Sequence, residues 1–327
     1  MNARSRRLRA GLFAALGFVA LSLVTLTGAG CSRRPDLTPR EGFVPVTGGR
    51  VWYRIVGTGH GTPLLVLHGG PGAPSYYLKP LGALGDDRPV IFYDQLGCGH
   101  SGKSDDSTLW TLDHYVNEID EVRHGLGLKD IDLYGHSWGT MLAAEYLFRQ
   151  PRGVHSVIFS SAALSVPLWI HDADSLRALL PDSLQRAITL HEKDGNTASP
   201  DYQNAMSVYY SQHMFRKLPP SADIDSSFSM LNRAIYDFMQ GPSEFTITGT
   251  LKTYDCTQRL HEITVPTLFL AGEHDEATPD ATIFYKDHIK GATCVLIPES
   301  GHLSMQDNPD RHNQAVRDFL RKVDAAK

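Results

Sequence analysis

Short apolar segments alternate with helical patterns along most of this chain, and that alternation most restricts its fold. The apolar runs have the length and character of strands buried in a parallel sheet. They are found at residues 51–56, 64–67, 90–93, 131–134, 157–160, 267–270 and 294–297. Helical patterns lie between them at residues 112–125, 140–150 and 311–323. This order predicts a mostly parallel sheet with helices on both faces, beginning near residue 41.

The alternation stops between residues 166 and 263. That stretch shows no clear apolar strand and holds helix-like pieces separated by proline and glycine. The pieces are residues 175–180, 183–192, 202–216 and 228–239. We therefore expect a helical cap at 166–263, inserted between a first part of the core at 41–165 and a second part at 264–327.

The sequence GHSWG at residues 135–139 places Ser137 between two glycines. It directly follows one predicted strand and precedes a predicted helix, which is the setting of the nucleophile elbow of the α/β-hydrolase fold. The alternative is a glycine-rich turn with a structural serine, and the strand-to-helix context weighs against it. We therefore predict an α/β-hydrolase fold with Ser137 as its nucleophile.

A second glycine-rich segment, HGGPG at residues 68–72, follows the predicted strand 64–67. Acyl transfer develops negative charge on a carbonyl oxygen, and two backbone N–H groups can stabilise it. In this fold one donor follows the nucleophile and the other lies in this loop. We assign them to Trp138 and Gly70, with Gly69 as an alternative donor that also contacts substrate. The competing interpretation is a plain turn.

The remaining catalytic groups should follow in the order acid, then histidine. GEHDE at residues 272–276 comes after a predicted strand and offers Asp275 as the acid, with Glu273 and Glu276 as alternatives. His302 lies after the last predicted strand and before the C-terminal helix, where the general base belongs. The chain has 15 histidines, so this placement, not the residue type, singles out His302.

The first residues have the layout of an export signal. Four arginines precede an uncharged run at residues 10–27, and small residues at 28–30 precede Cys31. We expect a signal peptide at 1–30, lipidation of Cys31 and a short tether at 31–40. The alternative is a signal anchor that is left uncut. We therefore expect an exported protein, which is either anchored to a membrane as a lipoprotein or located in the periplasm or outside the cell.

Composition excludes several other classes. The net charge of −5 leaves no basic footprint for nucleic acid. With four cysteines and neither a CxxC pair nor an HExxH run, the sequence predicts no metal site and no cofactor. A binding protein that has lost catalysis is a further alternative, but such proteins usually lack a member of the triad.

Three segments together resemble the proline iminopeptidases. They are HGGPG at 68–72, DQLGCGHS at 94–101 and GHSWG at 135–139, within a resemblance that runs from about residue 41 to the C-terminus. These are α/β-hydrolase serine aminopeptidases that include the tricorn-interacting aminopeptidase. The resemblance implies removal of an N-terminal residue, such as proline, from short peptides through an acyl-enzyme. Relatives include amino-acid amide hydrolases, so an amino-acid amide or small ester hydrolase is the alternative.

The resemblance also implies how substrate is recognised. GPSEFTITG at residues 241–249 is similar to the segment whose glutamate binds the substrate's free amino group, which points to Glu244. The family uses more than one acid there, and Asp225 and Asp237 are candidates for the second. The expected partners are therefore short peptides or amino-acid amides with a free N-terminus. Asp94 is expected to brace its own loop.

The N-terminal segment leads to a direct test. Mass spectrometry of the mature protein should find Cys31 as the first residue, carrying a diacylglyceryl group, because the small residues before it form the cleavage site. A soluble cytoplasmic protein that retains Met1 would contradict the prediction.

Overall fold

The computed structural model describes residues 36–326. The expected signal peptide and Cys31 therefore lie outside the described residues. Within the described part, no helix is both long and apolar enough to cross a membrane.

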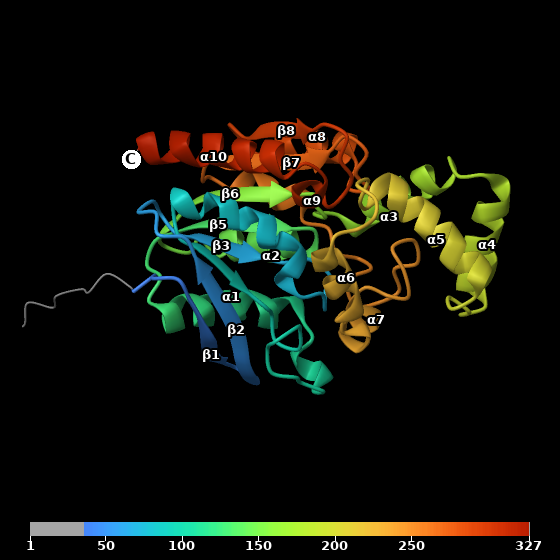
Figure 1. The fold of residues 1–327 in the computed structure, drawn as a ribbon, viewed down its shortest axis with the longest axis horizontal. Helices are drawn as coiled ribbons and strands as arrows, with labels where there is room; N and C mark the ends of the chain where they lie inside the picture. The colour runs from blue at the N-terminus through green and yellow to red at the C-terminus, as the bar shows by residue number, and fades with distance from the viewer. Residues whose placement is uncertain (1–35, 327) are drawn as a thin grey trace, which may run out of the picture. The chain divides into compact units, whose positions relative to one another are not determined.

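Residues 36–326 contain one eight-stranded sheet with the order β1-β2-β4-β3-β5-β6-β7-β8 (Figure 1). The strands are β1 (Arg40–Val46), β2 (Gly49–Val56), β3 (Leu64–Leu67), β4 (Val90–Tyr93), β5 (Ile131–His136), β6 (Val154–Ser160), β7 (Thr267–Gly272) and β8 (Thr293–Ile297). β2 pairs antiparallel with β1 and with β4, and all the remaining pairs are parallel. The mostly parallel sheet that the sequence predicted is confirmed.

Helices connect the strands. The α-helices are α1 (Leu112–Leu126), α2 (Trp138–Phe148), α3 (Val166–Arg177), α4 (Asp182–Lys193), α5 (Pro200–His213), α6 (Ala222–Ser229), α7 (Arg233–Met239), α8 (Pro279–Asp287), α9 (Ser304–Asp307) and α10 (Pro309–Ala325). Three 3₁₀ segments are η1 (Ser75–Asp86), η2 (Ser107–Leu109) and η3 (Thr257–Glu262).

The sheet is buried on both faces, as alternate residues of β3 illustrate. Leu65 and Leu67 pack in one hydrophobic cluster with side chains of α1, α2 and α8. Leu64 and Val66 pack in a second cluster with side chains of η1 and α10. Because successive strand side chains point to opposite faces, an all-apolar run such as β3 requires a covering layer on each side.

The inserted helical cap is confirmed: α3 to α7 all lie between β6 and β7 (Figure 1). One detail of the prediction was wrong, because residues 228–239 are not one helix but span the end of α6 and the whole of α7. Asn232 lies between the two helices, directly before α7. Its side chain accepts hydrogen bonds from the backbone N–H groups of Ala234 and Ile235. An asparagine in this position starts a new helix and so ends the old one.

The edge strand β1 was not predicted from sequence. Its exposure alternates, and it contains Gly42 and Pro45, which both weaken a strand signal. Proline is tolerated because β1 is an edge strand and pairs only with β2.

Candidate active site

Ser137 occupies a sharp turn between β5 and α2. Its φ of 53° and ψ of −121° lie outside the helical and strand regions. A Cβ on Gly135 would lie 2.4 Å from the Gly139 carbonyl oxygen, and one on Gly139 would lie 2.2 Å from the Leu67 carbonyl oxygen. Only glycine fits at either position, so the two glycines of the motif are required for the chain to close around Ser137.

The structure brings His302 and Asp275 together. The Nδ1 atom of His302 lies 2.8 Å from Oδ1 of Asp275, and both side chains are almost fully buried. Asp275 also accepts hydrogen bonds from the Ser161 hydroxyl and the Ala277 backbone N–H. These bonds hold the carboxylate in place and leave Nε2 of His302 for a proton from Ser137.

The two alternatives to Asp275 lie elsewhere. Glu273 is exposed and accepts a hydrogen bond from the Glu299 backbone N–H. Glu276 is buried and lines the cavity that contains Ser137, whereas the side-chain hydrogen bond to Nδ1 of His302 comes from Asp275.

The two predicted oxyanion donors differ from Gly69 in one respect. The Gly69 N–H already donates to the Tyr77 hydroxyl at 2.7 Å. Within the described residues, the N–H groups of Gly70 and Trp138 donate to no protein group. Trp138 is also the first residue of α2, where backbone N–H groups point out of the helix end. This arrangement favours Gly70 over Gly69 as the second donor.

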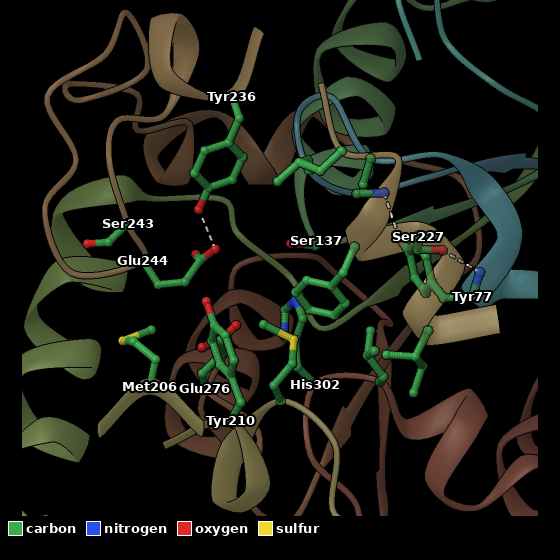
Figure 2. Close-up of a pocket in the computed structure, with 18 of the residues that line it drawn as sticks. Tyr77, Ser137, Met206, Tyr210, Ser227, Tyr236, Ser243, Glu244, Glu276 and His302 are labelled. Carbon is green, nitrogen blue, oxygen red and sulfur yellow. Dashed lines mark hydrogen bonds between the residues drawn. The ribbon is translucent and has the colours of Figure 1, made fainter. Parts of the chain in front are cut away.

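A cavity of about 410 Å³ joins the elbow to the cap. Ser137, His302, Glu244 and Glu276 all line it (Figure 2). No hydrogen bond links Ser137 Oγ to His302 among the described residues, which is common in enzymes without bound substrate.

Glu244 is held in the cap by several contacts. Its carboxylate accepts a hydrogen bond from the Tyr236 hydroxyl, and its backbone carbonyl accepts one from the Trp169 indole at 3.1 Å. The Trp169 ring also packs edge-on against the His302 ring, with centroids 5.7 Å apart. Trp169 therefore fixes the position of Glu244 relative to the histidine.

A second acid, Glu276, faces the same space. Within residues 36–326, neither of its buried carboxylate oxygens has a partner at hydrogen-bond geometry, although the Tyr209 hydroxyl approaches them. Burial raises the pKa of both Glu276 and Glu244, and the two acids repel each other's negative charge. The expected candidates Asp225 and Asp237 are exposed and do not line the cavity, so the acid that lies with Glu244 is Glu276.

Asp275, Glu276 and Glu244 change the pKa of His302. Burial lowers the pKa of His302, but Asp275 outweighs this through its charge and hydrogen bond, with further help from Glu276 and Glu244. Together they raise the pKa of His302 to about 9.

Hydrogen bonds through Tyr77 and His136 link the loop after β3, the turn that holds Ser137 and the loop that holds His302. The Tyr77 hydroxyl accepts from Gly69 and donates to Nδ1 of His136 at 2.9 Å. Nε2 of His136 then donates to the backbone carbonyl of His302 at 3.0 Å. Burial holds the pKa of His136 well below its usual value, so its ring is neutral and the bonds keep this direction. His136 is thus a buried positioning group.

Gln95 makes a second link, between the loop after β3 and the residue that follows Ser137. Its side chain donates to the His68 carbonyl at 3.1 Å and accepts from the Trp138 indole at 2.9 Å.

The neighbouring Asp94 is buried and accepts hydrogen bonds from Ser75 and His100. Asp94 therefore braces its loop, as expected.

Potential metal ligands gather at one surface position. Ligand atoms of Glu273, His274 and Glu299 lie within 4.8 Å of one another. None of these residues lines the cavity that contains Ser137.

The sequence reasoning missed Glu276 as a cavity residue and the roles of Tyr77 and Gln95. Glu276 was offered only as an alternative to Asp275, because two neighbouring acids in the loop after β7 look alike in sequence. Tyr77 lies in a 3₁₀ segment without a motif, so nothing in the sequence pointed to it.

Comparisons with known proteins agree with this geometry. A family model described as alpha/beta hydrolase fold matches residues 62–309. The chain is 43% identical to the proline iminopeptidase of Heyndrickxia coagulans over 86% of its length and 99% of that protein.

Two solved structures are also similar. The crystal structure of a Mycobacterium smegmatis proline iminopeptidase is 35% identical, with a TM-score of 0.82, over 88% of this chain and 99% of that one. The crystal structure of VinJ is 32% identical, with a TM-score of 0.84, over 89% of this chain and 100% of that one.

Replacing the predicted nucleophile is the first test of the site. We expect Ser137→Ala to lower turnover by at least about 10⁴-fold, because only the oxyanion donors and substrate binding remain. A fluorophosphonate probe should label the wild type at Ser137 and leave the variant unlabelled, while thermal unfolding shows both to be folded. Equal labelling of the two proteins would remove Ser137 from the mechanism.

Proposed function

Because the chain belongs to the proline iminopeptidase family of α/β-hydrolases, we propose that it is a serine aminopeptidase that releases N-terminal proline from short peptides. The observation that carries the proposal is the pair of acids, Glu244 and Glu276, in the same cavity as Ser137. The names of the similar proteins support proline as the residue released.

The reaction begins with acylation. His302 takes the proton of Ser137 through Nε2, and Ser137 Oγ attacks the carbonyl carbon of the first peptide bond. The N–H groups of Gly70 and Trp138 stabilise the negative oxygen that forms. The C–N bond then breaks, His302 returns the proton to the departing amine, and the first residue stays bound to Ser137 as an ester.

Deacylation repeats these steps with water. His302 takes a proton from the water molecule as it attacks the ester, and then returns that proton to Ser137 as the free amino acid leaves. Asp275 stays ionised throughout and stabilises the positive charge on His302.

The acids supply selectivity for a chain end. A free N-terminus differs from an internal peptide bond in its ammonium group, which pairs with the carboxylates of Glu244 and Glu276. The positive charge of the ammonium also offsets the negative charge of the two acids. It therefore reduces the electrostatic effect by which they raise the pKa of His302. A bound substrate with a free N-terminus thus lowers the pKa of His302 and leaves more of it unprotonated and able to accept the Ser137 proton.

We also propose that the protein is exported and attached to a membrane through a lipid on Cys31. The proposal rests on the arginine-rich start, the uncharged run and the small residues before the cysteine.

Charge-neutral variants test amino recognition. Glu244→Gln and Glu276→Gln should each lower kcat/KM for a proline-initiated peptide by roughly 10²–10³-fold, because the ammonium loses a buried partner. Hydrolysis of a small uncharged ester should change much less. Glu273→Gln is the matched control, since this acid lies three residues before Glu276 in the same loop, is exposed and lies outside the cavity.

Two results would count against amino recognition. Equal loss of ester and peptide hydrolysis would make the acids structural. Cleavage of N-acetylated and free peptides at the same rate by the wild type would favour an amide or ester hydrolase without selection for a free N-terminus.

The same acids predict a shift in pH dependence. Hydrolysis needs unprotonated His302, so kcat/KM for an uncharged ester rises as pH passes through the pKa of His302. Because Glu276 raises that pKa, Glu276→Gln should move the rise to lower pH. Glu273→Gln should leave it in place. A rise that stays unchanged or moves to higher pH in Glu276→Gln would contradict this electrostatic coupling.

A further inference from the structure

The two ends of the cavity differ in chemistry. Among the described residues that line it, those with a formal charge are Glu244, Glu276 and Arg233. The Arg233 guanidinium lies over the Tyr236 ring, 5.0 Å from its centroid, and Tyr236 is the hydrogen-bond partner of Glu244. Figure 2 shows Tyr236 and Glu244 together, on one side of Ser137.

The opposite end is apolar. Four of its lining residues, Tyr77, Met214, Ile224 and Leu303, pack in a single hydrophobic cluster. Figure 2 shows Tyr77 on the far side of Ser137 from Glu244.

Helix α6 forms one wall of this end. The Ser227 hydroxyl accepts a hydrogen bond from the Tyr77 backbone N–H at 3.1 Å, which fixes α6 beside η1 (Figure 2). Ile224 and Phe228 are four residues apart, so they share a face of the helix, and both line the cavity. Among the described residues at this end, none carries a formal charge.

Geometry sets the direction in which a substrate lies. The proposed function places the ammonium group at Glu244 and Glu276 and the reacting carbonyl at Ser137. The amine released in acylation must then extend away from the acids, past Ser137, toward Tyr77.

We propose that the apolar end, lined by Tyr77, Met214, Ile224, Phe228 and Leu303, binds the released portion of the peptide and selects an apolar side chain at its first residue. This inference rests on the proposed function, which sets the orientation.

The same end should discriminate against free dipeptides. In a dipeptide the α-carboxylate belongs to the residue directly after the cleaved bond, so it would enter the apolar end without a counter-ion. Burying an unpaired carboxylate is costly. Longer peptides and amides avoid that cost because they carry an uncharged amide at this position.

The experiment compares leaving groups on one acyl residue. The substrates are Pro-Leu-NH₂, Pro-Gly-NH₂, Pro-Asp-NH₂ and the free acid Pro-Leu, each measured as kcat/KM. All four give the same acyl-enzyme, so differences report acylation alone. We expect Pro-Leu-NH₂ to exceed Pro-Gly-NH₂ by about 10-fold through burial of its side chain. It should exceed Pro-Asp-NH₂ and free Pro-Leu by at least about 10-fold.

A charged variant should reverse part of this preference. Phe228→Arg should raise the kcat/KM ratio of free Pro-Leu to Pro-Leu-NH₂ by about 5- to 10-fold, because the guanidinium can pair with the carboxylate. Phe238→Arg is the matched control: Phe238 is 40% exposed and Phe228 43%, both belong to cap helices, and Phe238 does not line the cavity. The control should keep the wild-type ratio, and thermal unfolding should show both variants folded.

Equal kcat/KM for all four substrates would overturn the inference, as would an identical ratio in Phe228→Arg and Phe238→Arg. N-acetylated versions of the same substrates separate this failure from a failure of the proposed function. If blocked and free substrates react equally, aminopeptidase selectivity fails. If blocked substrates do not react and the leaving groups are not distinguished, only the apolar site fails.

Discussion

The strained turn at Ser137 is the constraint on which the site depends. A residue held in such a backbone region costs about 1–3 kcal/mol and persists only where its surroundings enforce it. Here β5 lies in the interior of the sheet between β3 and β6, and the Leu67 carbonyl closes directly over Gly139. The same close packing brings the loop after β3 beside the turn, so the geometry that strains the serine also places the oxyanion donors around it.

Negative charge around His302 is the second organising feature. Asp275 is satisfied by hydrogen bonds, whereas the buried carboxylate of Glu276 has only the approaching Tyr209 hydroxyl and no hydrogen bond of good geometry among the described residues. A buried acid without a partner is costly, and proteins rarely retain one without a use. An ammonium group can supply such a partner, so the position of Glu276 in the cavity fits the substrate class that we propose.

The sequence predicted the parts of the site that local chemistry specifies. The GHSWG turn depends on glycine at two positions, and His302 follows the last strand, so both could be located from residue order. Glu276 could not be separated from Asp275, because two neighbouring acids look alike until the backbone shows which one faces His302. The break at Asn232 was missed because its role as a helix start depends on cap packing. Strand β1 was missed because an exposed edge strand lacks a continuous apolar pattern.

The cap and the core meet at residues that also hold the catalytic loops. Asn232, which begins α7, donates its backbone N–H to the Gly72 carbonyl and its side chain to the Gly97 carbonyl. At the end of α5, the His213 carbonyl accepts the backbone N–H of His302 at 2.7 Å. A shift of the cap would therefore disturb the oxyanion loop and the histidine loop as well as Glu244. The amino-binding acids and the chemical machinery are mechanically joined, so recognition of the chain end and activation of the serine require the same arrangement of the cap.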